Sequence, residues 1–115
     1  MITNQEAFDG ALKHLRAQGK RAVDENDSCM YRQGNLKCAI GALIPDEKYN
    51  PEFEHLSVCV ESVIEAFDGN LEECDFYQIL QEELHDDLDD DLTGLEQSAQ
   101  NLAQKWKLNY VPSNY

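Results

Sequence analysis

The sequence predicts a mostly helical α+β domain, in which about four helices pack on one short antiparallel β-hairpin. Three observations support this prediction. Apolar residues recur at helical spacing in four segments, near residues 4–18, 51–67, 70–88 and 93–106. A Gly-Asn turn separates two short alternating segments within residues 29–40. The chain has 115 residues, a length typical of one domain, which we expect to span residues 1–108, with 109–115 as a C-terminal tail.

The first helix has clear start and stop signals. Thr3 and Glu6 have the spacing of a capping box, and Gly19 is a natural C-terminal stop. The residues between them carry an apolar stripe of Phe8, Ala11, Leu12 and Leu15. We therefore predict a helix from about Asn4 to Gln18.

The predicted hairpin turns at Gly34-Asn35. In that register Arg32 faces Lys37, Tyr31 faces Cys38, Met30 faces Ala39 and Cys29 faces Ile40. Period-2 alternation then places four mostly apolar residues on one face, namely Cys29, Tyr31, Cys38 and Ile40. Because an isolated hairpin is marginal in water, we expect this face, with both thiols, to pack against the helices.

Three further helices follow. Asn50-Pro51 predicts a helix start, and the apolar stripe continues to Phe67 before Asp68-Gly69-Asn70 interrupts it. Asn70 and Glu73 resemble a cap for a third helix, whose apolar face continues to Leu88. Thr93 and Glu96 have capping-box spacing for a last helix that ends near Trp106.

Charge is the strongest compositional feature. The formal net charge is −14, and residues 38–104 hold eighteen acidic groups and one basic group, Lys48. Such a chain repels nucleic acid and anionic membranes, so we expect no direct nucleic acid and no membrane among its partners. A protein with a basic surface is the expected kind of partner, although a high charge also serves solubility alone.

Seven carboxylates fall within ten residues: Glu82, Glu83, Asp86, Asp87, Asp89, Asp90 and Asp91. In a helix they would follow one another at about one charge per 2 Å, close to the ~1.7 Å of duplex DNA. Mimicry of DNA is therefore an alternative to partner binding. A solvated acidic face that favours the N-terminus of the next helix is the simplest alternative.

The cysteines and histidines have no recognisable metal spacing. No C-x-x-C pair occurs among Cys29, Cys38, Cys59 and Cys74. Cys59 and Cys74 lie on apolar helix faces, where free cysteine behaves as a small hydrophobe. His55 lies four residues before Cys59, so a thiol- or zinc-dependent site remains an alternative. Nucleophilic catalysis is another alternative, and it would need Cys29 or Cys38 to meet His55 or His85. We nevertheless predict no enzyme, no cofactor and no metal, because no catalytic motif is present.

The location expected for the chain follows from what it lacks. No apolar run of ~18 residues is present, and the N-terminus has no basic region followed by an apolar stretch. We therefore expect a cytoplasmic protein with reduced thiols. A disulfide between Cys29 and Cys38 is also disfavoured because the two residues are diagonal to each other in the predicted hairpin.

The segment CMYRQGNLKCAIGALIPDEKYNPEFE, from Cys29 to Glu54, resembles a motif of small phage- and prophage-encoded proteins of uncharacterised function. Their pattern is C-x-Y-R, a glycine turn, then K-C-A-[IV]-G-x-L-I-P-D-E-x-Y. A second fragment resembles the family's Leu-Gln…His-Asp segment, with Leu80, Gln81, His85 and Asp86 at the matching positions. The resemblance implies a mobile-element origin and action in a bacterial cytoplasm, and it implies no catalytic residue.

These observations together predict a small acidic phage-type protein that binds a host protein and modulates or inhibits it, in counter-defence or host takeover. The expected contact surface is the acid segment, residues 82–91.

Overall fold

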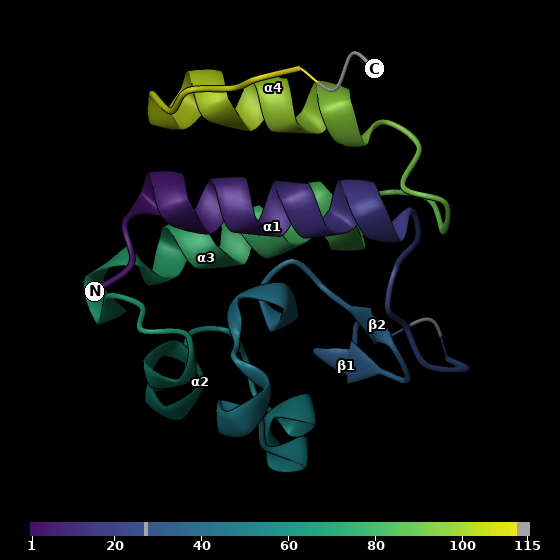
Figure 1. The fold of residues 1–115 in the computed structure, drawn as a ribbon, viewed down its shortest axis with the longest axis vertical. Helices are drawn as coiled ribbons and strands as arrows, with labels where there is room; N and C mark the ends of the chain where they lie inside the picture. Colours follow the sequence, from purple (N-terminus) through teal and green to yellow (C-terminus); the bar gives the residue numbers. More distant parts are fainter. Residues whose placement is uncertain (27, 113–115) are drawn as a thin grey trace.

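The computed structural model describes residues 1–26 and 28–112, except for the side chain of His55. The predicted fold class, helices packed on a two-stranded antiparallel hairpin, is confirmed (Figure 1). The α-helices and strands are α1 (Asn4–Gln18), β1 (Arg32–Gln33), β2 (Leu36–Lys37), α2 (Glu61–Ala66), α3 (Cys74–Gln81) and α4 (Leu95–Trp106). Within the described residues, no helix is long and apolar enough to cross a membrane.

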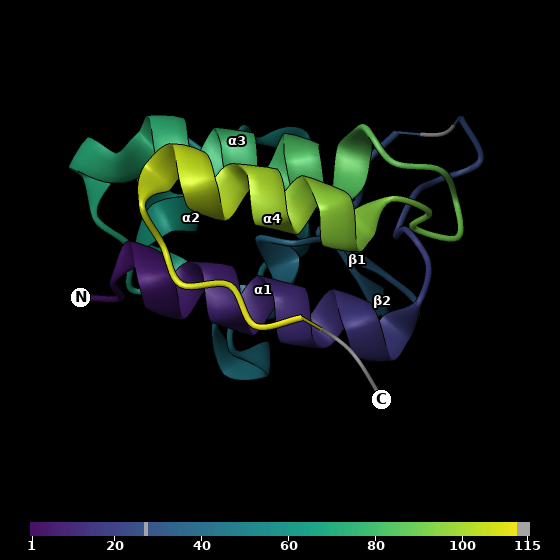
Figure 2. The ribbon, with the colours of Figure 1, turned by 90° about the horizontal axis from the view of Figure 1, so that it is seen from above.

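Three helices, α1, α3 and α4, lie side by side, and the hairpin and α2 lie on one side of α1 and α3 (Figures 1 and 2). The core forms between these layers. Its largest fully buried side chains are Tyr77, Phe8, Phe76, Leu15, Ile40, Ile44, Ile64, Leu80, Leu84, Leu102, His85 and Val63. The same interior therefore holds one imidazole among aromatic and aliphatic groups.

Helix α1 has the predicted bounds and caps. The Thr3 hydroxyl accepts a hydrogen bond from the Glu6 N–H at 3.0 Å, and the Glu6 carboxylate accepts one from the Thr3 N–H at 2.9 Å. Gly19 ends the helix in the left-handed conformation, at φ 74°, which glycine adopts without a steric cost. Local sequence signals alone specify this element.

The hairpin has the predicted register but is shorter than predicted. Arg32 pairs with Lys37 and Gln33 with Leu36, and the ladder stops there. Cys29 pairs with Val23 rather than with Ile40, so the predicted pairing beyond the two-residue strands is wrong. Gly41 explains the early stop, because a 3₁₀ turn at Gly41–Leu43 crosses the end of β1 so closely that a Cβ on Gly41 would lie 2.1 Å from the Tyr31 carbonyl oxygen.

The single helix predicted from Pro51 to Phe67 is wrong. Asn50 does cap a helix start, since its side chain accepts a hydrogen bond from the Glu52 N–H at 2.9 Å, but the 3₁₀ helix ends at His55 and α2 begins only at Glu61. Between them the Ser57 hydroxyl accepts from the Cys59 N–H at 3.1 Å, a local turn that competes with helix. Ser-Val-Cys-Val at residues 57–60 also has low helix propensity, so nothing local opposes the break.

The last two predicted caps are only partly correct. Asn70 accepts from the Glu72 N–H at 3.0 Å and begins a 3₁₀ turn, after which α3 starts at Cys74. The expected capping box of Thr93 with Glu96 is wrong, because the Thr93 hydroxyl donates to Asp91 at 2.6 Å and Gly94 precedes α4 with φ 91°. Glu96 is instead paired with Arg16.

The described part of the expected tail, residues 109–112, runs back along α1 (Figure 2). The Arg16 guanidinium donates to the Val111 carbonyl at 2.7 Å, and the Tyr110 hydroxyl donates to Glu96 at 2.8 Å. Asn109 and Gln5 exchange two further hydrogen bonds. This stretch is therefore attached to the helices, while residues 113–115 lie outside the described part of the chain.

Candidate functional site

A cavity of about 220 Å³ opens where the segment before β1, the segment around residues 54–58 and the end of α3 meet. Its lining residues are Cys29, Tyr31, Glu54, Leu56, Ser57, Val58, Gln78, Gln81, Glu82 and Asp86. The prediction that both hairpin thiols fill the interior is therefore correct for Cys38, which is fully buried, and wrong for Cys29, which lines the cavity.

Gln81 connects the walls of this cavity. Its side-chain oxygen accepts a hydrogen bond from the buried Ile40 N–H at 2.9 Å. Its amide nitrogen donates to the Asp86 carboxylate at 2.9 Å and to the Cys29 sulfur at 3.0 Å. Since an amide has two N–H donors, both are used, and one glutamine on α3 fixes the chain on both sides of the hairpin.

His85 is fully buried on a π-helix, Glu82–Asp86, which directly continues α3. Its Nε2 accepts a hydrogen bond from the Ala22 N–H at 2.9 Å, so in the neutral ring the hydrogen is on Nδ1. That Nδ1–H donates to the Asp86 carboxylate at 2.7 Å. The two bonds fix both the tautomer and the orientation of the ring.

The pKa values of Asp86 and His85 depend on burial and on the hydrogen bonds that each side chain makes. Burial disfavours the Asp86 carboxylate, but the hydrogen bonds from His85 and Gln81 outweigh burial and hold the pKa of Asp86 below its usual value. Burial also disfavours a charged imidazole, while the bond to Asp86 raises the pKa of His85. The added proton would have to sit on Nε2, facing the Ala22 N–H, so protonation of His85 is opposed by loss of that buried bond.

Cys29, His85 and Asp86 each bring a possible metal-ligand atom within 4.8 Å of the others. The donor set nevertheless does not fit a metal ion as arranged. The ring nitrogen on the Asp86 side, Nδ1, carries the hydrogen, and moving it to Nε2 would set two N–H groups against each other at Ala22. The histidine of the expected alternative pair, His55, has its side chain outside the described residues.

The same cluster does not activate a nucleophile. A hydrogen bond with Cys38 and burial raise the pKa of Cys29 above its ordinary value, so at neutral pH the sulfur is a thiol. Thiolate, rather than thiol, is the reactive form of cysteine. In this network the Cys29 sulfur accepts a hydrogen bond from the Gln81 amide.

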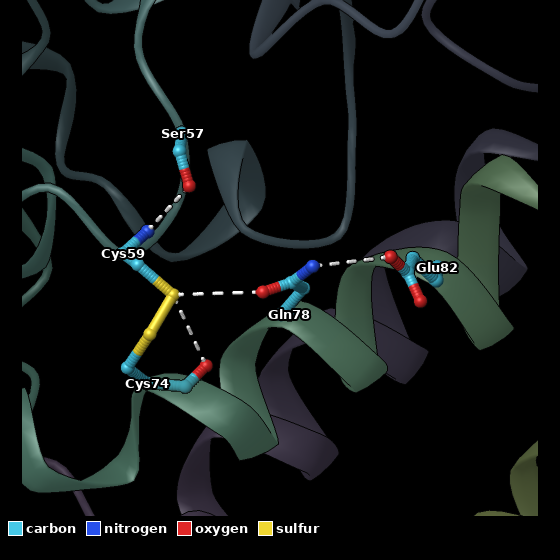
Figure 3. The surroundings of a disulfide bond; sticks show 5 residues. All are labelled: Ser57, Cys59, Cys74, Gln78 and Glu82. Atoms are coloured by element: carbon cyan, nitrogen blue, oxygen red, sulfur yellow. Dashed lines mark hydrogen bonds between the residues drawn. A yellow bond between two sulfur atoms is a disulfide. The ribbon is translucent and has the colours of Figure 1, made fainter.

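Cys59 and Cys74 form a disulfide, which corrects the prediction that both are free buried thiols and, with it, the expectation of a protein whose thiols are all reduced (Figure 3). Their Cα atoms are 5.1 Å apart, within the range that a bridge requires. The bridge ties the segment before α2 to the first residue of α3. The Cys59 sulfur also lies 3.7 Å from the side-chain oxygen of Gln78, a residue of the cavity wall. The predicted continuous helix through Cys59 hid this pairing.

Glu54 is a second organising residue that the sequence did not single out. Its two carboxylate oxygens accept hydrogen bonds from the Tyr31 N–H at 2.8 Å and the Arg32 N–H at 3.0 Å. The Tyr49 hydroxyl donates to the same carboxylate, and burial together with this bond raises the pKa of Tyr49 to about 12. Glu54 therefore holds the outer edge of β1, where unpaired N–H groups are otherwise exposed.

The seven acidic residues predicted as a contact surface do not form one helical row. The helix ends at Asp86, and the remaining carboxylates follow in a loop. Asp86 turns into the His85–Gln81 network and Glu83 is half-buried, while Glu82, Asp87, Asp89, Asp90 and Asp91 are exposed. The helical charge spacing that suggested DNA mimicry is therefore absent.

Arg21 holds this acidic loop in place. Its guanidinium pairs with Asp90 and donates to the Asp86 carbonyl at 3.2 Å, and its N–H donates to the Asp90 carbonyl at 2.9 Å. Arg16 is paired with Glu96 through two hydrogen bonds of 2.8 Å and 2.6 Å. Both of these basic side chains, at and just after the end of α1, are therefore paired within the protein.

Two sequence fragments that lie far apart in the chain, residues 29–54 and 80–86, meet at the cavity. Cys29 and Tyr31 come from the first fragment, and Gln81 and Asp86 from the second. Comparisons of this chain with protein-family models, curated proteins and solved structures find no match.

Proposed function

We propose that this chain is a non-catalytic binding protein that engages a protein with a basic surface and alters or inhibits it. The observation that supports the proposal most is the acidic loop after the π-helix, where Asp87, Asp89 and Asp91 are exposed and Arg21 holds the backbone. A held loop loses less conformational entropy on binding than a mobile one. The protonated state favoured for Cys29 supports the non-catalytic part of the proposal.

The finer parts of the proposal rest on the sequence resemblance. A phage-type origin would place the protein in a bacterial cytoplasm, where the partner would be a host protein and where the Cys59–Cys74 bridge would face a reducing environment. A net charge of −14 would steer a basic partner toward the protein at long range and would make the association sensitive to salt.

The test compares capture of bacterial lysate proteins by the wild-type chain and by two triple variants of equal net charge. Asp87→Asn, Asp89→Asn and Asp91→Asn change the loop, while Glu61→Gln, Glu65→Gln and Glu72→Gln change exposed acids on and near α2. We expect the loop variant to lose the captured partner by about tenfold or more and the control to retain it. Equal loss from both variants, or no captured protein at all, contradicts the proposal.

The same experiment addresses DNA mimicry. A captured protein that binds DNA, and that duplex DNA displaces from this chain, would assign the acidic loop to mimicry. A captured protein that DNA does not displace supports ordinary charge complementarity.

A further inference from the structure

We propose that the 220 Å³ cavity is an anchor pocket for one arginine side chain of the basic partner. This inference rests on the proposed function and assigns it a specific site. Interfaces commonly concentrate their binding energy in a few buried anchors, among which arginine is enriched.

The size of the cavity fits a single side chain. Pockets for drug-sized ligands occupy about 300–1,000 Å³, more than the roughly 220 Å³ available here. The wall combines an aromatic ring, Tyr31, with the aliphatic groups of Leu56 and Val58. Leu56 is 36% exposed, so the apolar wall reaches the surface. An arginine can lay its apolar stem along such a wall and carry its charged end inward.

The charge of the cavity calls for a cation. Glu54, Glu82 and Asp86 contribute three carboxylates, and none of the ten lining residues is basic. Glu54 already accepts three hydrogen bonds, from the Tyr31 and Arg32 N–H groups and from the Tyr49 hydroxyl. Asp86, in contrast, accepts hydrogen bonds from the Gln81 amide and the His85 ring, and no lysine or arginine is among the lining residues beside it. A half-buried carboxylate without a cation is stabilised when one arrives.

The chemistry favours arginine over lysine as the occupant. The Tyr31 hydroxyl is occupied, because it donates to the Leu56 carbonyl at 2.8 Å, and the ring is what the residue offers to a ligand. A planar guanidinium stacks on an aromatic ring and spreads its donors over two carboxylates, here Glu82 and Asp86. Lysine presents one compact, strongly hydrated charge and lacks the planar group that stacks on a ring.

The pocket and the acidic loop belong to one stretch of chain, since Asp86 lines the cavity and Asp87 begins the exposed loop. They therefore have complementary roles in one association. The loop attracts a basic surface from a distance, and the pocket receives one residue of that surface.

The test is a titration of the isotope-labelled full chain with Nα-acetyl-arginine amide, followed by amide NMR, with Nα-acetyl-citrulline amide as the uncharged control of the same shape. We expect saturable shifts at Tyr31, Gln78 and Glu82 with the arginine compound and none with the citrulline compound. The substitution Glu82→Gln should lower the affinity for the arginine compound by about threefold. The substitution Glu65→Gln, at an exposed acid on α2, should leave this affinity unchanged. The spectrum of each variant shows whether the variant is folded.

Three results would overturn the pocket: equal shifts with both compounds, shifts confined to residues 87–91, or no difference between the Glu82 and Glu65 variants. The failure of the pocket remains distinguishable from the failure of the proposed function. If partner capture depends on the acidic loop but not on Glu82, only the pocket proposal is refuted. If no capture depends on the loop, the proposed function is refuted.

Discussion

Gln81 and His85 are the two residues whose importance exceeds what their types suggest. Each satisfies a buried backbone N–H, that of Ile40 and that of Ala22. A buried amide that loses its partner costs its full desolvation free energy. Gln81 therefore supplies the partner that the short hairpin does not give to Ile40, and His85 supplies one to Ala22 in the segment between α1 and β1.

We predict that Gln81→Ala lowers the free energy of unfolding by about 2–3 kcal/mol, because the Ile40 N–H is left unpaired and Asp86 loses a donor. Urea denaturation monitored by circular dichroism measures the change. Gln104→Ala, an exposed position on α4, is the matched control and should stay within about 0.5 kcal/mol of wild type. Similar values for the two variants would refute the structural role of Gln81.

Asp86 should contribute a pH-dependent part of the stability. Its pKa is lowered in the folded protein, so its stabilisation is present above the unfolded pKa, about pH 4, and is lost as the pH falls through the lower folded pKa. We predict that Asp86→Asn removes this component. Unfolding free energies measured from neutral pH down into the acid range would show a shallower fall for the variant, and parallel curves would contradict the assignment.

At the residue scale, sequence reasoning succeeded where a signal was local. The Thr3–Glu6 box and Gly19 depend only on near neighbours in α1. It missed Glu54 and the role of Gln81, because the backbone N–H groups that these side chains bind lie 22 or more residues away in the sequence. Nothing in the spacing of a lone glutamate or glutamine indicates which backbone groups it will reach.

At the scale of the elements too, the local signals of the hairpin predict its register correctly, whereas the apolar spacing over residues 51–67 predicts a helix that does not form. The register of the hairpin follows from Gly34-Asn35 and the separation of polar from apolar faces, and both are local. The helix predicted over residues 51–67 failed because Phe53, Val63, Ile64 and Phe67 are buried without belonging to one helix. Helical spacing of apolar residues is necessary for such a helix but does not exclude a break.

The disulfide is the element-scale feature that sequence spacing did not reveal. It closes a 15-residue separation, between the segment before α2 and the start of α3. We predict that Cys59→Ala with Cys74→Ala lowers the free energy of unfolding by about 3 kcal/mol, in line with the chain entropy released by opening such a loop. Reduction of the wild-type protein with dithiothreitol should have a similar effect and should leave the double variant unchanged.

A thiol count provides the direct check of this bridge. Under denaturing conditions without reductant, only Cys29 and Cys38 should react with a thiol reagent. All four cysteines should react after reduction. Four reactive thiols without reductant would show that the bridge does not form in solution.

At the scale of the whole molecule, the apolar packing lies in the helical core, and the acidic charge is concentrated in the segment that follows α3. The helical core is apolar and continuous through α1, α3 and α4. The last described residues attach to α1 and α4 through Arg16, Glu96 and Tyr110, so the compact unit includes residues 109–112 as well as the predicted 1–108. Sequence reasoning identified the acidic segment, but it could not show that Asp86 turns inward and that a cavity forms beside it.

The binding surface that we propose is the acid-rich stretch from Glu82 to Asp91. The most direct measurement is a map of amide NMR shifts on adding a short arginine-rich peptide at low salt. We predict that the shifted residues cluster at 82–91 and at the cavity lining around Tyr31, and that added salt reverses the shifts. Shifts spread evenly over acids elsewhere, such as Glu47, Glu52 and Glu72, would contradict it.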